Sequence, residues 1–529
     1  PRSTLFPYTT LFRSGGLLIR NRNFCRLAPL VLVLLAALLR FGYLEAAPRG
    51  MQFDHVDAQG YHWIAVNLLE RGVFSMNTEA PFREDNIRAP LYPLFVAGWY
   101  AIGGPMPEVV VLAQVLVDVL TVGVLFRLGK QVAGRRVGWL AALLYALHPA
   151  PWRFCNELLT EILFGLLLTS SVWMFARYLA RGRNRDALRC GVLFGAAILC
   201  KPNIQFLPLV LVVILLHGVT TGRKQWWQGA ALMAGVIALM LAPWMLRNRI
   251  IFGEAFYTRT FDDNLAHVSA VATLAEIEGE PVAPWTPRWE ELYAQVIAQA
   301  AQRYGWASVD EATLSSRERD VRLQQITAVS LDLLRAHPKE FVVSHTRSWL
   351  WSFIPQEHKF WYTRLSGQSW DALPTEGDAL GRALKALGQG QVVRAGTILL
   401  QERLLALPPL ALFLWVGWAI GSAAVILLCF VGAARLRPRM LAGFMMATLF
   451  YVTFVPGPIS QVRFRLPVLP TILLLVAVGA QSLFRSNSDD EQTDRFAVYD
   501  EIRERNLKAE PEQVEADVAE ALRAARGKK

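Results

Sequence analysis

Acidic and basic side chains are grouped in this sequence at the ends of its apolar segments. The carboxylates are Asp54, Asp57, Glu157 and Glu161, and the cations are Arg88, Lys201, Arg247, Arg463 and Arg465. A carboxylate can accept the proton of an attacking hydroxyl group, and fixed cations can stabilise a departing phosphate. Because each residue lies at a helix end or in the short loop beside one, we expect the group to converge on one cleft at a membrane surface. The combination favours group transfer from a phosphate-linked donor.

The richest stretch is residues 54–93, which begins D-H-V-D-A-Q-G-Y and ends I-R-A-P-L-Y-P. Asp57 and Tyr61 are four residues apart, so they share one face if residues 57–71 are helical. Asp57 then lies near the N-terminus of that helix, where the helix dipole favours a carboxylate. A lone loop aspartate is more often a solvated cap, so the spacing alone does not assign a catalytic role.

The remaining cations also have structural explanations. Lys201 and Arg247 are compatible with anchors at span ends, where long basic side chains reach the membrane surface. Arg463 and Arg465 point to the same side if their stretch is extended. One of them is then free to bind phosphate while the other anchors the span.

The composition predicts a membrane protein. The 529-residue chain is 53% hydrophobic and 18% charged, with a mean hydropathy of +0.30. A bilayer core about 30 Å thick needs about 20 helical residues per span. We expect spans at 27–44, 108–128, 137–150, 158–178, 190–217 with a break at Lys201-Pro202, 228–246, 405–432, 440–455 and 466–484.

The positive charge is explained by membrane topology. A formal net charge of +11 would suggest nucleic acid binding in a soluble chain, but here the arginines crowd the short loops between apolar runs. Loops of that kind lie on the cytoplasmic side. If 90–102 is a surface or re-entrant helix instead of a crossing, all of these loops fall on one side and both termini are cytoplasmic. No nucleic acid partner is expected.

This topology divides the chain into five parts. Residues 1–14 resemble translated adapter sequence and are excluded from the fold. Residues 15–249 form an N-terminal membrane bundle whose first external loop is 45–107. Residues 250–402 form an external helical segment, in which helices are expected at 290–304 and 315–336, and a helix in the interface plane from Pro338. Residues 403–484 complete the spans, and 485–529 form a cytoplasmic tail with a helix at 514–526.

Motifs in a fixed order along the chain resemble the glycosyltransferases of the GT-C fold. They are H-V-D-A-Q-G-Y, R-A-P-L-Y-P-L-F, L-L-T-E-I-L-F, C-K-P, A-P-W-M-L-R-N-R-I-I-F-G and Q-V-R-F-R-L-P-V-L-P. The most similar set is the dolichyl-phosphate-mannose protein mannosyltransferases of family 39, with their bacterial aminoarabinose-transferase relatives. The similarity covers roughly residues 27–260 and 400–484. It implies an all-α, polytopic, GT-C-like membrane bundle with an extracytoplasmic helical loop domain.

The resemblance also implies an activity. The enzyme would move a sugar from a polyprenyl phosphate to a hydroxyl of a protein, lipid or glycan acceptor, with inversion, on the extracytoplasmic face. Asp57 matches the family's catalytic carboxylate, which we expect to act as general base, and Glu161 matches the acidic residue that opens the fourth span. Arg88 and Arg463 match basic positions, the first of them associated with the donor phosphate. The expected substrate-binding set is completed by Tyr61, Tyr92, Glu157, Lys201, Arg247 and Arg465.

No cofactor is expected, with a divalent metal as the lesser alternative. Several relatives have a second acidic residue directly after the first, whereas Ala58 follows Asp57 here. His55 and His62 bracket Asp57, but isolated loop histidines usually bind nothing. The five cysteines show no C-x-x-C spacing, which favours neither a disulfide framework nor a metal site.

Two other functions remain open at this point. Asp118 lies inside an apolar span one turn after Gln114, and an ionisable residue at that depth is a functional candidate. It favours a transporter or lipid flippase with a polar path through the bundle. Against that alternative, the inner spans carry almost no other charges and no internal repeat is evident. A structural subunit with an inactive site is the third possibility. Glu157 and Glu161, one helical turn apart, also have a structural explanation as helix-start caps near the positive end of a helix dipole.

Overall fold

The computed structural model describes the chain from residue 22 to residue 483 with several gaps. The ranges are 22–46, 50–53, 55–220, 225–279, 282–306, 313–352, 357–368, 373, 379–401, 405–459 and 462–483. Asp54, the segment 1–14 and the tail 485–529, with the helix expected at 514–526, lie outside the described residues.

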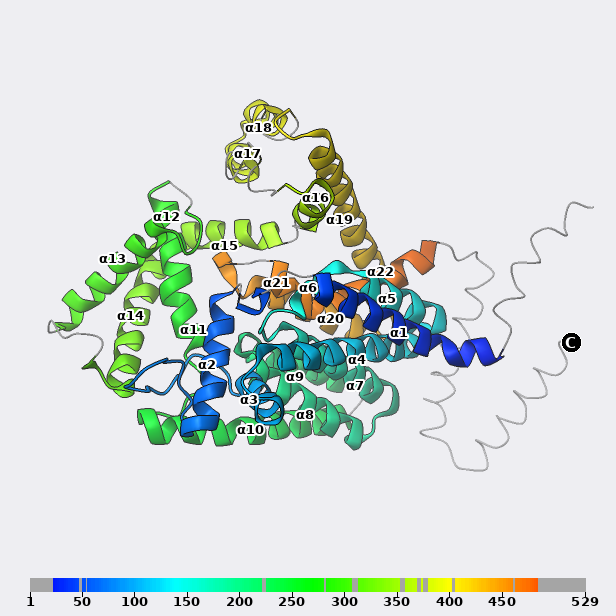
Figure 1. Cartoon of the computed structure of the whole chain (residues 1–529), viewed down its shortest axis with the longest axis horizontal. Coiled ribbons are helices and arrows are strands. Elements are labelled where there is room, and N and C mark those ends of the chain that lie inside the picture. The colour runs from blue at the N-terminus through cyan, green and yellow to red at the C-terminus, as the bar shows by residue number, and fades with distance from the viewer. Residues whose placement is uncertain are drawn as a thin grey trace, which may run out of the picture. The chain divides into compact units, whose positions relative to one another are not determined.

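The described residues form helices and contain no strand, which confirms the all-α fold class. Figure 1 shows their arrangement. The bounds of the first half are α1 (Arg22–Ala46), η2 (Met51–Phe53), α2 (Val56–Arg71), α3 (Leu91–Gly103), α4 (Pro107–Ala133), α5 (Arg135–Leu147), α6 (Pro149–Phe154), α7 (Glu161–Arg181), α8 (Asn184–Cys200), η3 (Pro202–Ile204), α9 (Leu207–Thr220) and α10 (Gln225–Phe252). Those of the second half are α11 (Thr260–Asp263), η4 (Asn264–Ala270), α12 (Val271–Ile277), α13 (Pro287–Tyr304), α14 (Ser316–Ala336), α15 (Pro338–Ser352), α16 (Glu357–Ser366), α17 (Ala379–Gly388), α18 (Val392–Leu399), α19 (Pro409–Arg435), α20 (Arg439–Phe454), η8 (Gly457–Ile459), α21 (Val462–Arg465), η9 (Leu466–Val468) and α22 (Leu469–Leu483).

Five of the described helices are long and apolar enough to cross a membrane. They are α4, α7, α10, α19 and the helical stretch Arg463–Leu483. The expected break at Lys201-Pro202 is present, because η3 separates α8 from α9. α3 has 13 residues, about 20 Å, and is too short for a bilayer core about 30 Å thick. This length fits the surface or re-entrant helix expected at 90–102.

One expected span is shorter than the sequence indicated. The apolar run 137–150 forms α5, which also has 13 residues and ends before His148. His148 has an extended backbone, with φ −72° and ψ 128°, and its side chain caps the next short helix, α6. Pro149 opens α6, and the residue before a proline is steered away from helical dihedrals. The prolines therefore end the helix early, although the run remains apolar.

Close packing of glycines brings α4 and α5 together. A Cβ atom added at Gly138 would lie 2.6 Å from the Phe126 carbonyl oxygen, and one added at Gly129 would lie 2.7 Å from the Cα of Gly138. Small residues at such a crossing let helix backbones approach closely in a membrane. α4 also packs against α7, and α7 against α8. The first membrane bundle is built around these contacts.

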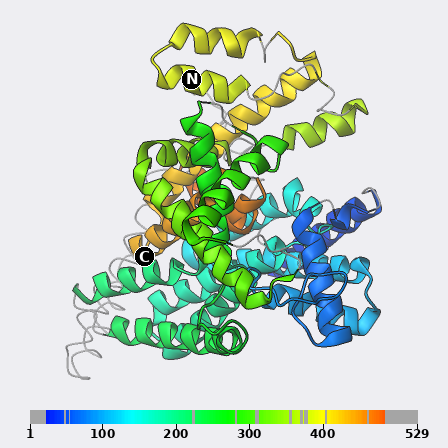
Figure 2. The same cartoon turned by 90° about the vertical axis from the view of Figure 1, so that its left-hand side faces the viewer.

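The described residues up to Val478 cluster as one compact unit, and Gly479–Leu483 belong to a second. The segment 250–402 lies within the first unit, and its described secondary structure elements are all helices. α13 packs against both α12 and α14 there, in green in Figures 1 and 2. α13 and α14 agree with the helices expected at 290–304 and 315–336. A capping box between Ser315 and Glu318 begins α14.

A buried ion pair joins the three helices at the start of the bundle. The Arg40 Nε donates to Asp118 Oδ2 at 2.6 Å, and its Nη1 donates to the Ala146 carbonyl oxygen at 2.9 Å. The Tyr145 hydroxyl donates to Asp118 Oδ1 at 2.5 Å. The charge of Asp118 is therefore balanced by Arg40, and the residue joins α1, α4 and α5. The buried carboxylate that favoured a transporter thus has a structural explanation.

Breaking this pair is expected to destabilise the protein. Arg40→Met leaves Asp118 buried without its counter-charge, which costs about 3–5 kcal/mol in buried pairs. The Arg40→Met/Asp118→Asn double variant removes both charges and keeps an acceptor for Tyr145, so most of the stability returns. Thermal unfolding in detergent measures both effects, with the exposed Arg135→Met as control. An Arg40→Met variant as stable as the control would contradict a structural role.

Candidate functional site

Helix α2 holds Asp57 in its first turn, as the sequence predicted. α2 runs from Val56 to Arg71, with the Nδ1 of His55 accepting from the Asp57 backbone N–H at 3.3 Å. Its other end is closed by Gly72, whose φ of 70° lets its N–H reach the carbonyl oxygens of the last turn. The Asp57 carboxylate is 38% exposed. It lies within the dipole field that favours an anion.

Arg463 pairs with Asp57 from more than 400 residues away. Its Nη1 lies 3.1 Å from Asp57 Oδ2 and 3.2 Å from His55 Nδ1. The guanidinium is 12% exposed and lies over the Phe464 ring at 4.8 Å. Its Nε–H is buried and has no hydrogen-bond partner in the part of the chain that the structure describes. One donor of this cation is therefore available to an anion.

Arg88 reaches the same carboxylate from the loop before α3. Its Nη2 lies 3.6 Å from Asp57 Oδ1, and its guanidinium lies 5.7 Å from the centre of the Tyr61 ring. Asp85 orients the loop, since its Oδ1 accepts from the Arg88 N–H at 2.7 Å and its Oδ2 faces Arg88 Nη1 at 3.3 Å. Among the described residues, Arg88 Nε–H also lacks a partner.

A second ion pair lies beside this group. The Lys201 Nζ donates to Glu161 Oε1 at 2.7 Å, and the Thr160 hydroxyl donates to Glu161 Oε2 at 3.1 Å. Glu161 opens α7 and is 1% exposed. Lys201 and Arg463 lie over the same ring, that of Phe464. The Lys201–Glu161 pair therefore lies beside the Asp57–Arg463 pair, because the Phe464 ring contacts both cations.

The electrostatics keep Asp57 ionised. Burial alone would raise the pKa of Asp57, but the positive charges of Arg463 and then Arg88 outweigh burial and hold the pKa below its usual value. Burial and the charge of Arg463 lower the pKa of His55, against the opposing charges of Asp57 and Glu161. His55 is thus a neutral acceptor at neutral pH, and Asp57 carries the negative charge.

The other residues expected in the cleft have different surroundings. Arg247 pairs with Glu84 and donates to the Asp85 carbonyl oxygen at 3.1 Å, so it supports the loop that carries Arg88. Glu157 pairs with Arg153 at 3.0 Å. Arg247 also lines a cavity of about 340 Å³, whose other lining residues are Leu68, Gly72, Phe74, Glu84, Pro90, Leu94, Trp244 and Ile251.

Tyr92 and Arg465 lie further from the Asp57 carboxylate in their contacts than Arg88 and Arg463, since neither pairs with it among the described residues. Tyr92 is fully buried, donates to Gln114 Oε1 at 2.8 Å and packs edge-on against Tyr61. The extended conformation that would place Arg463 and Arg465 on one side is not found, because Val462–Arg465 forms the helical turn α21. Side chains two apart in a helix point to different sides. Arg465 therefore does not share the side of Arg463.

Three residues at the site were not predicted to act there. Asp85 shapes the Arg88 loop, and its signal was an acidic residue three positions before that arginine. His55 caps α2 and contacts Arg463. Burial raises the pKa of Asp263, while the charges of His267 and Arg88 oppose the rise and Asp85 and Asp57 add to it. Nothing in the local sequence indicated that Asp263 lies close enough to Arg88 and Asp57 for their charges to act on it.

The carboxylates and histidines of the described segments do not form a metal site. No three His, Cys, Asp or Glu side chains among the residues that the structure describes are close enough together to hold an ion. Asp57 and Glu161 are each paired with cations instead. We therefore derive no step through a metal ion.

A small substitution on α2 is expected to disturb Arg88. A Cβ atom added at Gly60 would lie 2.8 Å from the Cζ and Nη2 of Arg88. Because the guanidinium is the flexible end of its side chain, Gly60→Ala should leave the fold intact and displace the cation from Asp57. We expect roughly tenfold weaker binding of an anionic ligand at this site, since a charged hydrogen bond contributes about 1.5 kcal/mol or more. Titration with the anionic ligand measures this affinity. The control is Gly98→Ala, because no heavy atom lies within 4 Å of a Cβ atom added there.

A protein family matches the central part of the chain. Residues 87–246 match the family described as dolichyl-phosphate-mannose-protein mannosyltransferase. These residues are therefore similar to that family, which confirms the resemblance drawn from the motifs over this range. The matched segment contains Arg88, Glu161 and Lys201, whereas Asp57 and Arg463 flank it. No curated protein matches the chain significantly.

Solved structures similar to the chain include membrane glycosyltransferases. The archaeal oligosaccharyltransferase AglB from Archaeoglobus fulgidus, in complex with an inhibitory peptide and a dolichol-phosphate, is 16% identical with a TM-score of 0.47, covering 95% of this chain and 54% of that one. The oligosaccharyltransferase of that organism with Zn and sulfate is 12% identical with a TM-score of 0.44, covering 90% and 51%. ArnT from Cupriavidus metallidurans bound to undecaprenyl phosphate is 16% identical with a TM-score of 0.37, covering 85% and 77%. The chain spans about half the length of the archaeal proteins.

Proposed function

We propose that this chain is an integral membrane glycosyltransferase that moves a sugar from a polyprenyl phosphate to an acceptor hydroxyl group. One observation carries the proposal: a carboxylate, Asp57, lies between two guanidinium groups, those of Arg88 and Arg463. Each guanidinium keeps a buried Nε–H without a partner in the described chain. The family description of residues 87–246 names a lipid-phosphate-linked sugar as donor.

The cations act on the leaving group. Arg88 and Arg463 bind the phosphate of the donor, and their charge stabilises the polyprenyl phosphate that departs. Such preorganised positive charge is often the largest single term in catalysis because it does not reorganise during the reaction. Arginine suits this task since its planar donors match phosphate oxygens. Lys201 adds positive charge at the edge of the site.

Asp57 acts as the general base. The acceptor oxygen forms its bond to the anomeric carbon while the bond from that carbon to the phosphate oxygen breaks, and the acceptor's proton goes to Asp57. Attack opposite the leaving phosphate inverts the anomeric centre. The low pKa of Asp57 keeps it ionised before the reaction. Donor phosphate on the same arginines adds negative charge beside the carboxylate, which raises its affinity for the proton when the proton is transferred.

The site has a defined place in the membrane topology of this proposal. Short arginine-rich loops on the cytoplasmic side leave α2, the loop before α3 and the segment 253–401 outside. The acceptor, a protein, lipid or glycan hydroxyl, then approaches from the extracytoplasmic side. The external helical segment shapes its binding surface. The polyprenyl chain lies in the bilayer, beside the membrane helices.

Lipid analysis of a deletion strain tests this function. Loss of the chain should cause one polyprenyl-phosphate-linked sugar to accumulate, and mass spectrometry of the lipid extract identifies it. The wild-type gene and Asp332→Asn should clear the lipid, whereas Asp57→Asn should not. A deletion strain without any such accumulation contradicts the use of this donor. Clearance by Asp57→Asn would instead indicate a structural subunit.

A further inference from the structure

We propose that Asp320, on α14 of the external segment, is a positioning residue that sets the place of Arg88 by anchoring Asn86. The inference rests on the proposed function, since it names a residue that determines the geometry of the same phosphate site. Asp320 lies more than 230 positions after Asn86 in the chain. It touches neither Asp57 nor Arg88 in any of the contacts that the described residues make.

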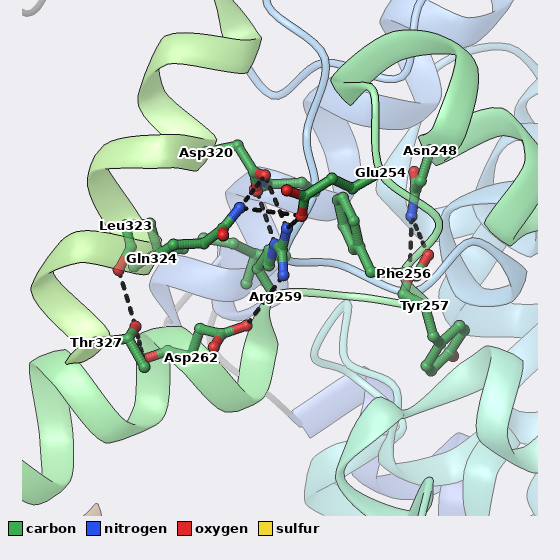
Figure 3. Close-up of polar contacts among 12 residues, drawn as sticks. Asn248, Glu254, Phe256, Tyr257, Arg259, Asp262, Asp320, Leu323, Gln324 and Thr327 are labelled. Atoms are coloured by element: carbon green, nitrogen blue, oxygen red, sulfur yellow. Dashed lines mark hydrogen bonds and ion pairs between the residues drawn. The ribbon is translucent and has the colours of Figure 1, made fainter. Parts of the chain in front are cut away.

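Asp320 is a buried carboxylate with both oxygens engaged (Figure 3). Its side chain is 2% exposed. Arg259 binds it through two parallel hydrogen bonds, Nε to Oδ1 at 2.8 Å and Nη2 to Oδ2 at 2.9 Å. Gln324 donates to Oδ2 at 3.0 Å, and the Asn86 Nδ2 donates to Oδ1 at 2.7 Å. Such bidentate, charge-assisted bonds fix direction as well as distance.

The loop around Asn86 is tied to the same external elements along its backbone. The Arg259 N–H donates to the Asn86 carbonyl oxygen at 2.8 Å, and the Thr260 hydroxyl donates to the Ile87 carbonyl oxygen. The Glu84 N–H donates to Ser316 Oγ at 3.1 Å in the first turn of α14. α14, Arg259 and the first residue of α11 therefore all bind this loop.

The restraint continues from Asn86 to the guanidinium of Arg88. Asp85 Oδ1 accepts from the N–H groups of Ile87 and Arg88, at 3.0 and 2.7 Å. A displacement of Asn86 therefore shifts the turn on which Arg88 is carried. A misplacement of about 1 Å in a positioning group can reduce a rate by about 10²-fold. Asp320 thus acts on the phosphate site through the loop.

The same helix offers a matched comparison. Asp332 lies three turns further along α14 and pairs with Arg303 of α13 at 2.6 Å. Both carboxylates belong to arginine pairs on one helix, but Asp332 is half exposed and Asp320 is bonded to the Arg88 loop. Asp332→Asn therefore reports the loss of an ion pair from α14 without a change at the loop.

Two measurements on the full-length protein in nanodiscs test the proposal. Hydrogen–deuterium exchange of the peptide covering 84–88 should rise in Asp320→Asn and in the milder Asn86→Ala, and stay at the wild-type level in Asp332→Asn. Titration with undecaprenyl phosphate should show roughly tenfold weaker binding for Asp320→Asn, with unchanged maximal occupancy. A tenfold loss of affinity corresponds to the loss of about one hydrogen bond to a charged group. Asn86→Ala, which leaves the Arg259 pair intact, covers the case in which Asp320→Asn fails to fold.

The outcomes separate this inference from the proposed function. Unchanged exchange at 84–88 in both Asp320→Asn and Asn86→Ala overturns the positioning role. Raised exchange with unchanged lipid affinity overturns it as well, because the loop would then not set the phosphate site. A wild-type protein that does not bind undecaprenyl phosphate contradicts the proposed donor, whatever the exchange result.

Discussion

Asp57→Asn is expected to lower the rate of sugar transfer by roughly 10²- to 10⁴-fold, the usual contribution of a general base. The amide keeps the shape of the side chain and cannot accept the proton of the acceptor hydroxyl. Single-turnover conversion of the lipid-linked sugar that accumulates in the deletion strain measures this rate. The amide keeps an oxygen that can accept from Arg463, and Arg88 keeps its pair with Asp85, so expression and thermal stability should change little.

Although Asp57→Asn should slow sugar transfer, it should not weaken binding of the lipid phosphate. Arg88 and Arg463 each pair with this carboxylate, and removing its charge leaves more positive charge for a phosphate. Undecaprenyl phosphate should therefore bind as tightly as to the wild type, or more tightly. Asp332→Asn controls for the loss of any carboxylate. Transfer at the wild-type rate in Asp57→Asn would remove Asp57 from the chemistry.

Arg463→Ala is expected to weaken the binding of undecaprenyl phosphate by roughly 10- to 150-fold, because hydrogen bonds to charged groups contribute about 1.5–3 kcal/mol. Arg463→Lys keeps the charge but loses the planar set of donors, so its affinity should be intermediate. The same loss should raise the pKa of Asp57, since Arg463 is the strongest cation acting on it. Titration in nanodiscs at two salt concentrations measures the affinity.

The control for this prediction is a cation outside the site. Arg303→Ala removes an exposed arginine of α13 that pairs with Asp332. Its lipid affinity should equal that of the wild type. If Arg463→Ala binds the lipid as tightly as Arg303→Ala does, the phosphate is held elsewhere.

Local sequence signals were sufficient for much of the architecture. The four-residue spacing of Asp57 and Tyr61 predicted a helix that exists as α2, with Asp57 in its first turn. Apolar length predicted the long membrane helices, and Pro202 marked the break between α8 and α9. These features depend on neighbours within one or two turns, which periodicity records directly. The juxtaposition of Asp57, Arg88 and Arg463 followed from the ordered motifs of a family resemblance.

The partners of buried charges could not be predicted in the same way. Arg40 was hidden inside an apolar run, and its pairing with Asp118 depends on how α1 packs against α4. Asp320 looked like any exposed residue of an amphipathic helix, yet it is buried against Arg259 and Asn86. Such pairs join residues 61 to 234 positions apart, and no periodic pattern encodes them. Similarly, the sequence left open whether the stretch of Arg463 and Arg465 is extended, and it forms the helical turn α21, because its surroundings decide the conformation of so short a segment.

A structure of the full-length protein with bound undecaprenyl phosphate, obtained by cryo-electron microscopy in nanodiscs, would show where the phosphate binds. We expect phosphate density in contact with both Arg88 and Arg463, beside the carboxylate of Asp57. Phosphate bound away from these two arginines, with Asp57 facing solvent, would contradict this expectation.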